Sequence, residues 1–195
     1  MSRFKLDSRK AIEATAILAR LSPGCKIGSK RLLALLYIAS RECLKRSGRP
    51  LLGGTLVAMK YGPINARVYD LIREKKDAEG SAEWAQHFHK DGYHIVLDKD
   101  PGINALSRFE ARLLEETLRK YEKDDDWDIA LLTHRFPEYH QTYRRKTKPR
   151  AISLQAIATA VGLGPMARSI ERDLKQQDDL DELFASAEKS SRKTR

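Results

Sequence analysis

The residues able to hold a metal ion or to transfer protons are few and scattered in this chain. His87 and His89 are one residue apart and His94 follows soon after, but no cysteine or regularly spaced aspartate lies beside them to complete a recognisable ligand set. A structural or exposed role is therefore the favoured interpretation of these histidines. A metal-dependent hydrolase that combines them with the acidic run at residues 124–126 is kept as the third functional hypothesis.

The acidic run has a simpler explanation. It directly precedes the apolar helical pattern WDIALLTH, and negative charge is favourable at the N-terminus of a helix. His134 and His140 are isolated, and no serine or cysteine lies in the context of a nucleophile elbow. No glycine-rich phosphate-binding pattern is present. The sequence therefore predicts no catalytic residue, no metal and no cofactor, and it indicates a protein that is not an enzyme.

Composition favours a basic binding protein of one domain. The 195 residues carry 37 Lys and Arg against 27 Asp and Glu, a formal net charge of +10, which attracts nucleic acid or an acidic protein partner. The longest apolar run, residues 32–39, is far shorter than the roughly 20 residues of a membrane span, and no apolar segment of a secretory signal follows the charged start. Cys25 and Cys43 are interpreted as free thiols, so we expect a cytoplasmic protein.

Two segments near the C-terminus could contact a macromolecule. The first, YRRKTKPR at residues 143–150, holds five basic residues, Arg144, Arg145, Lys146, Lys148 and Arg150. The second, at residues 154–174, has two short helical patterns divided by glycines and resembles a helix-turn-helix. Arg168 and Arg172 would then be the residues that enter a DNA groove, with the basic segment on the phosphates. A solvated loop and an ordinary helical hairpin explain the same two patterns.

The periodicity predicts a mainly α fold: a compact helical domain with a small two-stranded β element, with α+β as the alternative. Helices are expected over residues 8–21, 29–45, 65–75 and 107–121, and as two short segments within 154–174. Strands are expected over residues 55–60 and 93–97, which could pair. In the helix that begins at the capping box of Ser107 and Glu110, the expected buried stripe is Phe109, Leu113, Leu114, Leu118 and Tyr121. Residues 1–175 are predicted to form one domain, and residues 176–195 the end of a helix and a disordered basic tail.

The stretch at residues 29–74 forms the most distinctive unit. Its first helical pattern is apolar on more than one face, which predicts a central, largely buried helix. A turn at residues 48–51, a strand pattern and the sequence YGPI at residues 61–64 follow. Because Pro63 fixes φ and is tolerated in the first turn of a helix, YGP is predicted to turn the chain into the next helix.

This stretch resembles the Panacea antitoxin domain, also called the SocA-like antitoxin domain. The resemblance covers about residues 31–161. Its clearest marks are Leu35-Leu36-Tyr37, Gly48-x-Pro50-Leu51, Tyr61-Gly62-Pro63-Ile64 and Val68-Tyr69, and its fainter marks are Leu106-Ser107 and Thr133-His134. Ala34 stands where members commonly have lysine, and the pair Gly53-Gly54 is unusual and predicts a different entry to the strand.

The resemblance implies a mainly helical cytoplasmic antitoxin of prokaryotic or phage origin. Such a protein neutralises a cognate toxin by direct binding, or delivers it to a protease. We expect the motif residues to be scaffold: Leu35, Leu36, Tyr37, Gly48, Pro50, Tyr61, Gly62, Pro63, Val68 and Tyr69. The partner would then bind elsewhere, and the five basic residues at 144–150 are the leading candidates. A DNA-binding regulator that uses residues 154–174 is the alternative.

Overall fold

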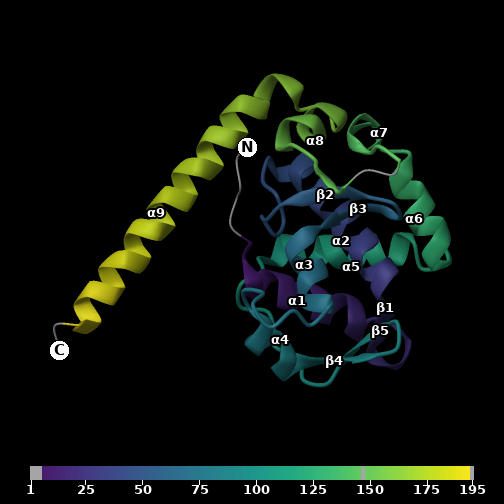
Figure 1. Cartoon of the computed structure of the whole chain (residues 1–195), viewed down its shortest axis with the longest axis horizontal. Coiled ribbons are helices and arrows are strands. Elements are labelled where there is room, and N and C mark those ends of the chain that lie inside the picture. Colours follow the sequence, from purple (N-terminus) through teal and green to yellow (C-terminus); the bar gives the residue numbers. More distant parts are fainter. Residues whose placement is uncertain (1–5, 146–147, 194–195) are drawn as a thin grey trace.

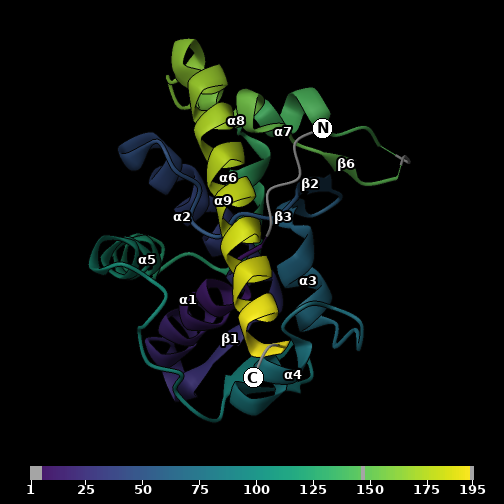
Figure 2. The ribbon, with the colours of Figure 1, turned by 90° about the vertical axis from the view of Figure 1, so that its left-hand side faces the viewer.

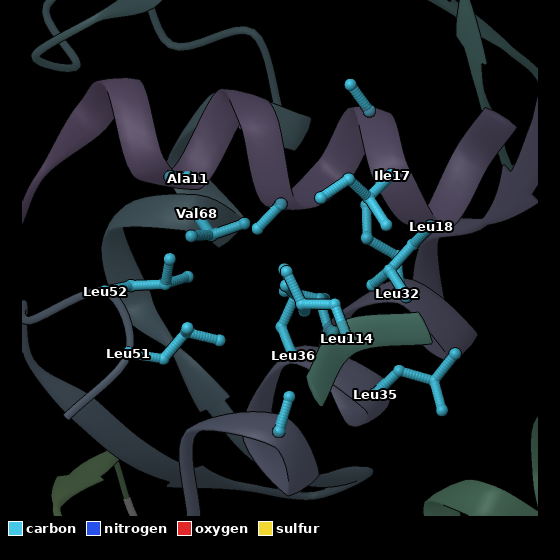
Figure 3. Close-up of a cluster of buried hydrophobic side chains, with 14 of the residues drawn as sticks. Ala11, Ile17, Leu18, Leu32, Leu35, Leu36, Leu51, Leu52, Val68 and Leu114 are labelled. Atoms are coloured by element: carbon cyan, nitrogen blue, oxygen red, sulfur yellow. The ribbon is translucent and has the colours of Figure 1, made fainter. Parts of the chain in front are cut away.

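Helix α2 (Ser29–Ser47) lies at the centre of the computed structural model, which describes residues 6–145 and 148–193. Every residue from 32 to 40 is buried, as the apolar residues on more than one face predict. Gly48 ends the helix in the left-handed conformation, with φ at 71°. Figure 3 shows Leu32, Leu35 and Leu36 of this helix within the main cluster of buried side chains.

Helices dominate the fold, which is mainly α with small antiparallel sheets, as the sequence predicts (Figure 1). Helices α1 and α5 pack on α2, and the start of α6 lies at the N-terminus of α2. The shorter α3, α4, α7 and α8 complete the body. The bounds are α1 (Ser8–Arg20), α3 (Ala66–Ile72), α4 (Ser81–His87), α5 (Arg108–Lys120), α6 (Asp126–His134), α7 (Pro137–Thr142) and α8 (Leu154–Ala160), with 3-10 turns η1 (Pro23–Cys25) and η2 (Gly164–Met166).

The strands form two small antiparallel sheets. One has the order β1-β5-β4 and the other β3-β2-β6. Their bounds are β1 (Lys26–Gly28), β2 (Leu56–Met59), β3 (Gly62–Asn65), β4 (Phe88–Asp91), β5 (His94–Leu97) and β6 (Arg150–Ala151). The predicted pairing of residues 55–60 with 93–97 is therefore wrong. Each strand instead pairs with its neighbour in a hairpin, which closes a much shorter loop at less entropic cost.

The YGP sequence forms part of a strand. The prediction that it turns the chain into a helix is wrong, because Gly62 and Pro63 pair with Met59 and Ala58 as the start of β3. Proline is tolerated there since β3 lies at the edge of its sheet, where a missing N–H leaves no ladder bond unmade. Helix α3 begins after Asn65, whose side chain accepts hydrogen bonds from the next amides.

The capping box at the start of α5 is confirmed, but the predicted buried stripe is wrong at its first residue. Ser107 and Glu110 satisfy each other's amides, and Glu110 also accepts a hydrogen bond from Lys10 at 2.6 Å. This contact turns Glu110 towards α1, so Phe109 points outwards and is 43 % exposed. Leu113, Leu114 and Leu118 are buried as predicted.

The C-terminal part is a two-helix unit followed by a long projection. Ile157 and Ala158 of α8 are buried in one cluster with Ala167 and Ile170 of α9 (Ala167–Lys193), and η2 lies between the two helices. Helix α9 then extends past α8 and away from the body (Figures 1 and 2). It includes residues 176–193, which the sequence assigns to a helix end and a tail. Within the described residues no helix is long and apolar enough to cross a membrane.

A buried carboxylate anchors the long loop before α5 to the first helix. Glu13 of α1 is 5 % exposed, and its two oxygens accept hydrogen bonds from the backbone amides of Asn104, Ala105 and Leu106 at 2.8–3.0 Å. These amides have no helix or strand partner of their own. The carboxylate therefore replaces a missing element of secondary structure and fixes the position from which α5 starts.

We predict that Glu13→Gln lowers the free energy of unfolding by about 1–3 kcal/mol. The substitution puts an NH2 group against backbone donors and leaves at least one buried amide without an acceptor. Urea denaturation measures the change. Glu122→Gln, at an exposed position after α5, is the matched control and should stay within about 0.5 kcal/mol of the wild type. Equal stability of the two variants would contradict the anchoring role.

Candidate partner-binding surface

The β2–β3 hairpin and helix α6 meet at a contact that only glycine allows. A Cβ atom at Gly62 would lie 2.6 Å from Oγ1 of Thr133, and φ of Gly62 is +119°. Thr133 cannot give way, because it is fully buried and its hydroxyl donates to the carbonyl of Ala130 at 2.6 Å. The clear motif YGP and the fainter motif Thr133-His134 are thus two sides of one close contact.

A buried ionic network ties α2 to the C-terminal helices. The hydroxyl of Tyr37 and Nε of Arg41 donate to the same oxygen of Glu138 on α7, at 3.0 and 2.9 Å. Glu138 is fully buried, and the guanidinium of Arg41 also lies over the ring of Phe136 and donates to the carbonyl of Ala160 in α8. Burial, and then the charge of Glu138, hold the pKa of Tyr37 well above its usual value. A buried charge paired in this way is structural.

A stack of three rings joins the end of β2 to α6 and α7. The hydroxyl of Tyr139 donates to the carbonyl of Met59 at 2.8 Å, and its ring stacks between His134 and Tyr143 with centroid distances of 4.7 and 5.2 Å. Burial raises the pKa of Tyr139 to about 12 and lowers the pKa of His134. His134 is thus a neutral packing residue, and its Nε2 is buried without a hydrogen-bond partner among the described residues.

The other histidines and the acidic run have local structural contacts. His87 and His89 bond through Nδ1 to the Lys99 carbonyl and to the Asp98 carboxylate, each at 2.8 Å. Within the run, Asp125 caps α6 as the sequence predicts. Asp126 lies beside Gly28 at the start of α2, where its negative charge interacts favourably with the positive end of the helix dipole. In the part of the chain that the structure describes, no three His, Cys, Asp or Glu side chains are grouped to hold a metal ion.

Exposed aromatic and basic side chains gather where the hairpin turn, the start of α2 and α6 meet. We call Lys30, Lys60, Tyr61, Trp127 and Leu131 the aromatic–lysine patch. Tyr61, Trp127 and Leu131 are each about half exposed, and Leu131 lies one helical turn after Trp127 on the same face of α6. The rings of Tyr61 and Trp127 meet edge to face, with centroids 5.7 Å apart. The ammonium of Lys30 lies 4.0 Å from the centre of the Trp127 ring and 5.4 Å from that of Tyr61.

The basic segment at residues 144–150 follows α7 and includes the first residue of β6. The side chains of Arg144, Arg145, Lys148 and Arg150 are exposed, and Lys146 lies outside the described residues. Arg144 donates to the carbonyls of His140 and Tyr143 at the end of α7. In β6, Arg150 pairs with Ala58 of β2, two residues before Lys60. β6 therefore lies alongside β2, the strand that ends one residue before Lys60.

The predicted scaffold residues fall into two groups. Most are buried or half-buried: Leu35, Leu36, Tyr37, Gly62, Pro63 and Val68 are buried, and Gly48, Pro50 and Tyr69 are intermediate. Tyr61 differs, since half of its surface is exposed and its ring lies in the patch. Arg168 and Arg172 are exposed on the first turns of α9.

No pattern in the sequence identifies Lys30, Lys60, Trp127 or Leu131 as surface residues of one site. The spacing of Trp127 and Leu131 places them on one helical face, but WDIALLTH is apolar all round, so the exposed face of this helix could not be chosen. Lys30 and Lys60 belong to segments thirty residues apart, so no local sequence pattern connects them with each other or with Trp127. Only the fold brings these four residues together with Tyr61.

The unusual Gly53-Gly54 pair shapes the other end of β2. Both glycines have positive φ, at 67° and 77°, and the Asn65 amide donates to the carbonyl of Gly53 at 2.9 Å. The pair lines a cavity of about 330 Å³ together with Arg67 and Asp70. The entry to the strand is thus a tight left-handed loop held by Asn65.

Comparison with known proteins gives a match to a family model. The family model described as "Antitoxin SocA-like, Panacea domain" matches residues 32–140, from the core of α2 to α7. No curated protein and no solved structure matches the chain. The matched range contains the hairpin, α6 and four of the five patch residues. Lys30 lies two residues before it.

We predict that Gly62→Ala destabilises the protein by about 2–4 kcal/mol. The added methyl group meets the fixed Thr133 hydroxyl, and alanine disfavours positive φ. Thermal or urea unfolding measures the loss. Gly92→Ala is the control, because Gly92 also has positive φ, at 58°, but a Cβ there meets no atom within 4 Å. A loss at Gly62 no larger than the loss at Gly92 would rule out the close contact.

We also predict that two of the seven tyrosines ionise late. The phenols of Tyr37 and Tyr139 should stay protonated in the folded chain near pH 10, where exposed tyrosines lose their protons. Because folding raises both pKa values, the stability that these two phenols contribute should be constant below about pH 10 and be lost as the pH rises towards 12. Ultraviolet titration of tyrosinate counts the late groups. Tyr139→Phe should remove one of them, and simultaneous ionisation of all seven would contradict the prediction.

Proposed function

Since the chain belongs to the SocA-like Panacea antitoxin family, we propose that it neutralises a cognate toxin by binding that toxin directly. The family match over residues 32–140 is the observation that carries this proposal. The geometry supports binding over catalysis, because buried Tyr37 and Glu138 and the partly buried His134 serve packing and ion pairing. We place this interaction in the cytoplasm.

The basic segment is the proposed electrostatic contact with the toxin. Arg145, Lys148 and Arg150 are exposed, and the chain as a whole has a net charge of +10, so an acidic face of the toxin would be attracted over a long range. Such charges act mainly on the rate of association and on its salt dependence. They complement an apolar contact and do not replace it.

The alternative function is sequence-specific DNA binding by α8 and α9. The observation that favours it is the packing of these two helices across the turn at residues 161–163, with Arg168 and Arg172 exposed on the second helix. This arrangement is typical of a helix-turn-helix. Glu171 and Asp173 lie between and beside the two arginines on α9, and their charge opposes binding to phosphate.

We predict that the full chain, purified from its native host after nuclease treatment and a salt wash, retains one protein at equal stoichiometry, and that this protein is toxic when expressed alone. Co-expression of the full chain should restore growth.

The triple variant Arg145→Glu, Lys148→Glu, Arg150→Glu should weaken the complex at least about tenfold, because three attractive charges become repulsive. Binding curves at several salt concentrations measure the loss.

Arg168→Glu combined with Arg172→Glu is the matched control, since it reverses two exposed charges outside the basic segment. The antitoxin proposal expects this double variant to bind the toxin normally. Loss of every protein partner, with a defined duplex fragment retained by the wild type and lost in the double variant, would instead establish the DNA-binding alternative.

The same co-expression separates blockade from delivery to a protease. An antitoxin that blocks its toxin leaves the toxin level unchanged while growth recovers. One that delivers the toxin lowers that level, and the level recovers in a host that lacks the protease. Immunoblots of the tagged toxin measure both outcomes.

A further inference from the structure

We propose that the aromatic–lysine patch is the central docking site for the toxin, and that the toxin segment it takes presents a carboxylate beside apolar side chains. This inference rests on the proposed function. Most of the binding free energy then comes from the patch and not from the basic segment. The helix α2, the β2–β3 turn and α6 bring its five residues together: Lys30, Lys60, Tyr61, Trp127 and Leu131.

The patch combines the side chains that dominate protein interfaces. Tyr61 and Trp127 are each 50 % exposed and Leu131 is 53 % exposed, so three large apolar groups face solvent side by side. Tryptophan and tyrosine are the residues most enriched among interface hot spots, where burial by a partner removes their apolar surface from water. Single exposed apolar residues are ordinary in folded proteins, whereas a contiguous group indicates an interaction site.

The patch is held rigidly before any partner arrives. The close contact of Gly62 with Thr133 fixes the hairpin on α6, and the Asp125 cap fixes the first turn of α6, which carries Trp127. Arg31 donates to the carbonyls of Tyr121 and Asp124 at 2.6 Å, which attaches the loop before α6 to α2. Rings held in their bound positions lose little conformational entropy when a partner binds.

The two lysines provide positive charge that the protein itself does not neutralise. Among the described residues, neither Lys30 nor Lys60 has a carboxylate within ion-pair distance, although the acidic run lies close by along the chain. Asp126 of that run lies against Arg31 instead, at 3.8 Å. Both ammonium groups lie over aromatic rings, an interaction that leaves them free to pair with an incoming carboxylate.

Three features favour a protein over a nucleic acid at this site. Bases stack on an open aromatic face, but Lys30 covers one face of Trp127 at 4.0 Å. The edge-to-face angle of 77° between Tyr61 and Trp127 offers no pair of parallel surfaces for successive bases. Asp124, Asp125 and Asp128 are exposed around Trp127, and their charges would repel a phosphate backbone. A protein segment needs no open stacking face, and one or two carboxylates placed on Lys30 and Lys60 meet much less repulsion from these aspartates than a phosphate backbone with one charge per nucleotide.

The basic segment extends the same surface. The pairing of Arg150 with Ala58 in the sheet brings β6 alongside the strand that ends at Lys60 and Tyr61. An acidic toxin face seated on the patch would therefore meet Arg150 and Lys148 at its edge. The patch supplies the buried centre of the interface and the basic segment its charged rim.

Fluorine NMR of the chain labelled with 5-fluorotryptophan tests this assignment directly. The chain has two tryptophans, Trp84, which is 4 % exposed, and Trp127 in the patch, so the spectrum has one buried and one exposed signal. Trp127→Phe assigns them. The probe is the toxic protein that the native-host purification recovers. Its addition should shift the Trp127 signal and leave the Trp84 signal unchanged.

Affinity measurements with patch variants complete the test. Tyr61→Ala with Trp127→Ala should weaken toxin binding at least about 100-fold, and Lys30→Ala with Lys60→Ala about tenfold with a smaller salt dependence. Because the two aromatic side chains are half exposed and the two lysines are exposed, both variants should fold, and circular dichroism checks that they do. Phe109→Ala is the control. This exposed ring lies in the first turn of α5, about 16 Å along that helix from the end that leads to α6, and its removal should change the affinity less than about twofold.

The outcomes separate this proposal from the one on which it rests. Unchanged toxin affinity in both patch variants, with no shift of the Trp127 signal, overturns the patch and leaves the antitoxin function intact. Absence of any toxic partner in the native-host purification overturns both. A Trp127 shift on adding the oligonucleotide dT12, lost in the lysine variant, overturns the choice of a protein partner.

Discussion

The approach of the β2–β3 hairpin to helix α6 at Gly62 and Thr133 is the constraint on which the functional surface depends. Without a side chain at residue 62, the strand can lie against a buried threonine whose hydroxyl is already bonded to its own helix. That contact sets the distance between Tyr61 and Trp127, which belong to different segments of the chain. The YGP motif, which the sequence predicts to be a turn, therefore holds the exposed rings of Tyr61 and Trp127 together.

Burial organises the rest of the molecule around α2. Its apolar residues contact α1 and α5 in the main core, whereas Tyr37 and Arg41 reach the buried carboxylate of Glu138 and so attach α7 and α8. The two kinds of contact differ in consequence. Apolar packing tolerates small shifts, but a buried ion pair needs both partners in place, so it fixes the C-terminal helices relative to α2.

Much of the helical fold could be predicted, because its signals are local. The glycine that ends α2, the capping box of Ser107 and the acidic cap of α6 each specify one boundary within a few residues. The YGP geometry could not be predicted, since it depends on Thr133, some 70 residues away. The patch was missed for the same reason: the exposure of Trp127 depends on which face of an evenly apolar helix packs against α2 and β3.

The central claim is that a toxin is held at the hairpin and α6, and hydrogen–deuterium exchange of the full chain tests it most directly. The chain is compared alone and in complex with the toxic protein from its native host. The account predicts slower exchange in the complex at the turn of residues 60–61 and in the first turn of α6, whose leading amides have no helical partner. Slowing confined to residues 154–174, with the hairpin and α6 unchanged, would contradict it.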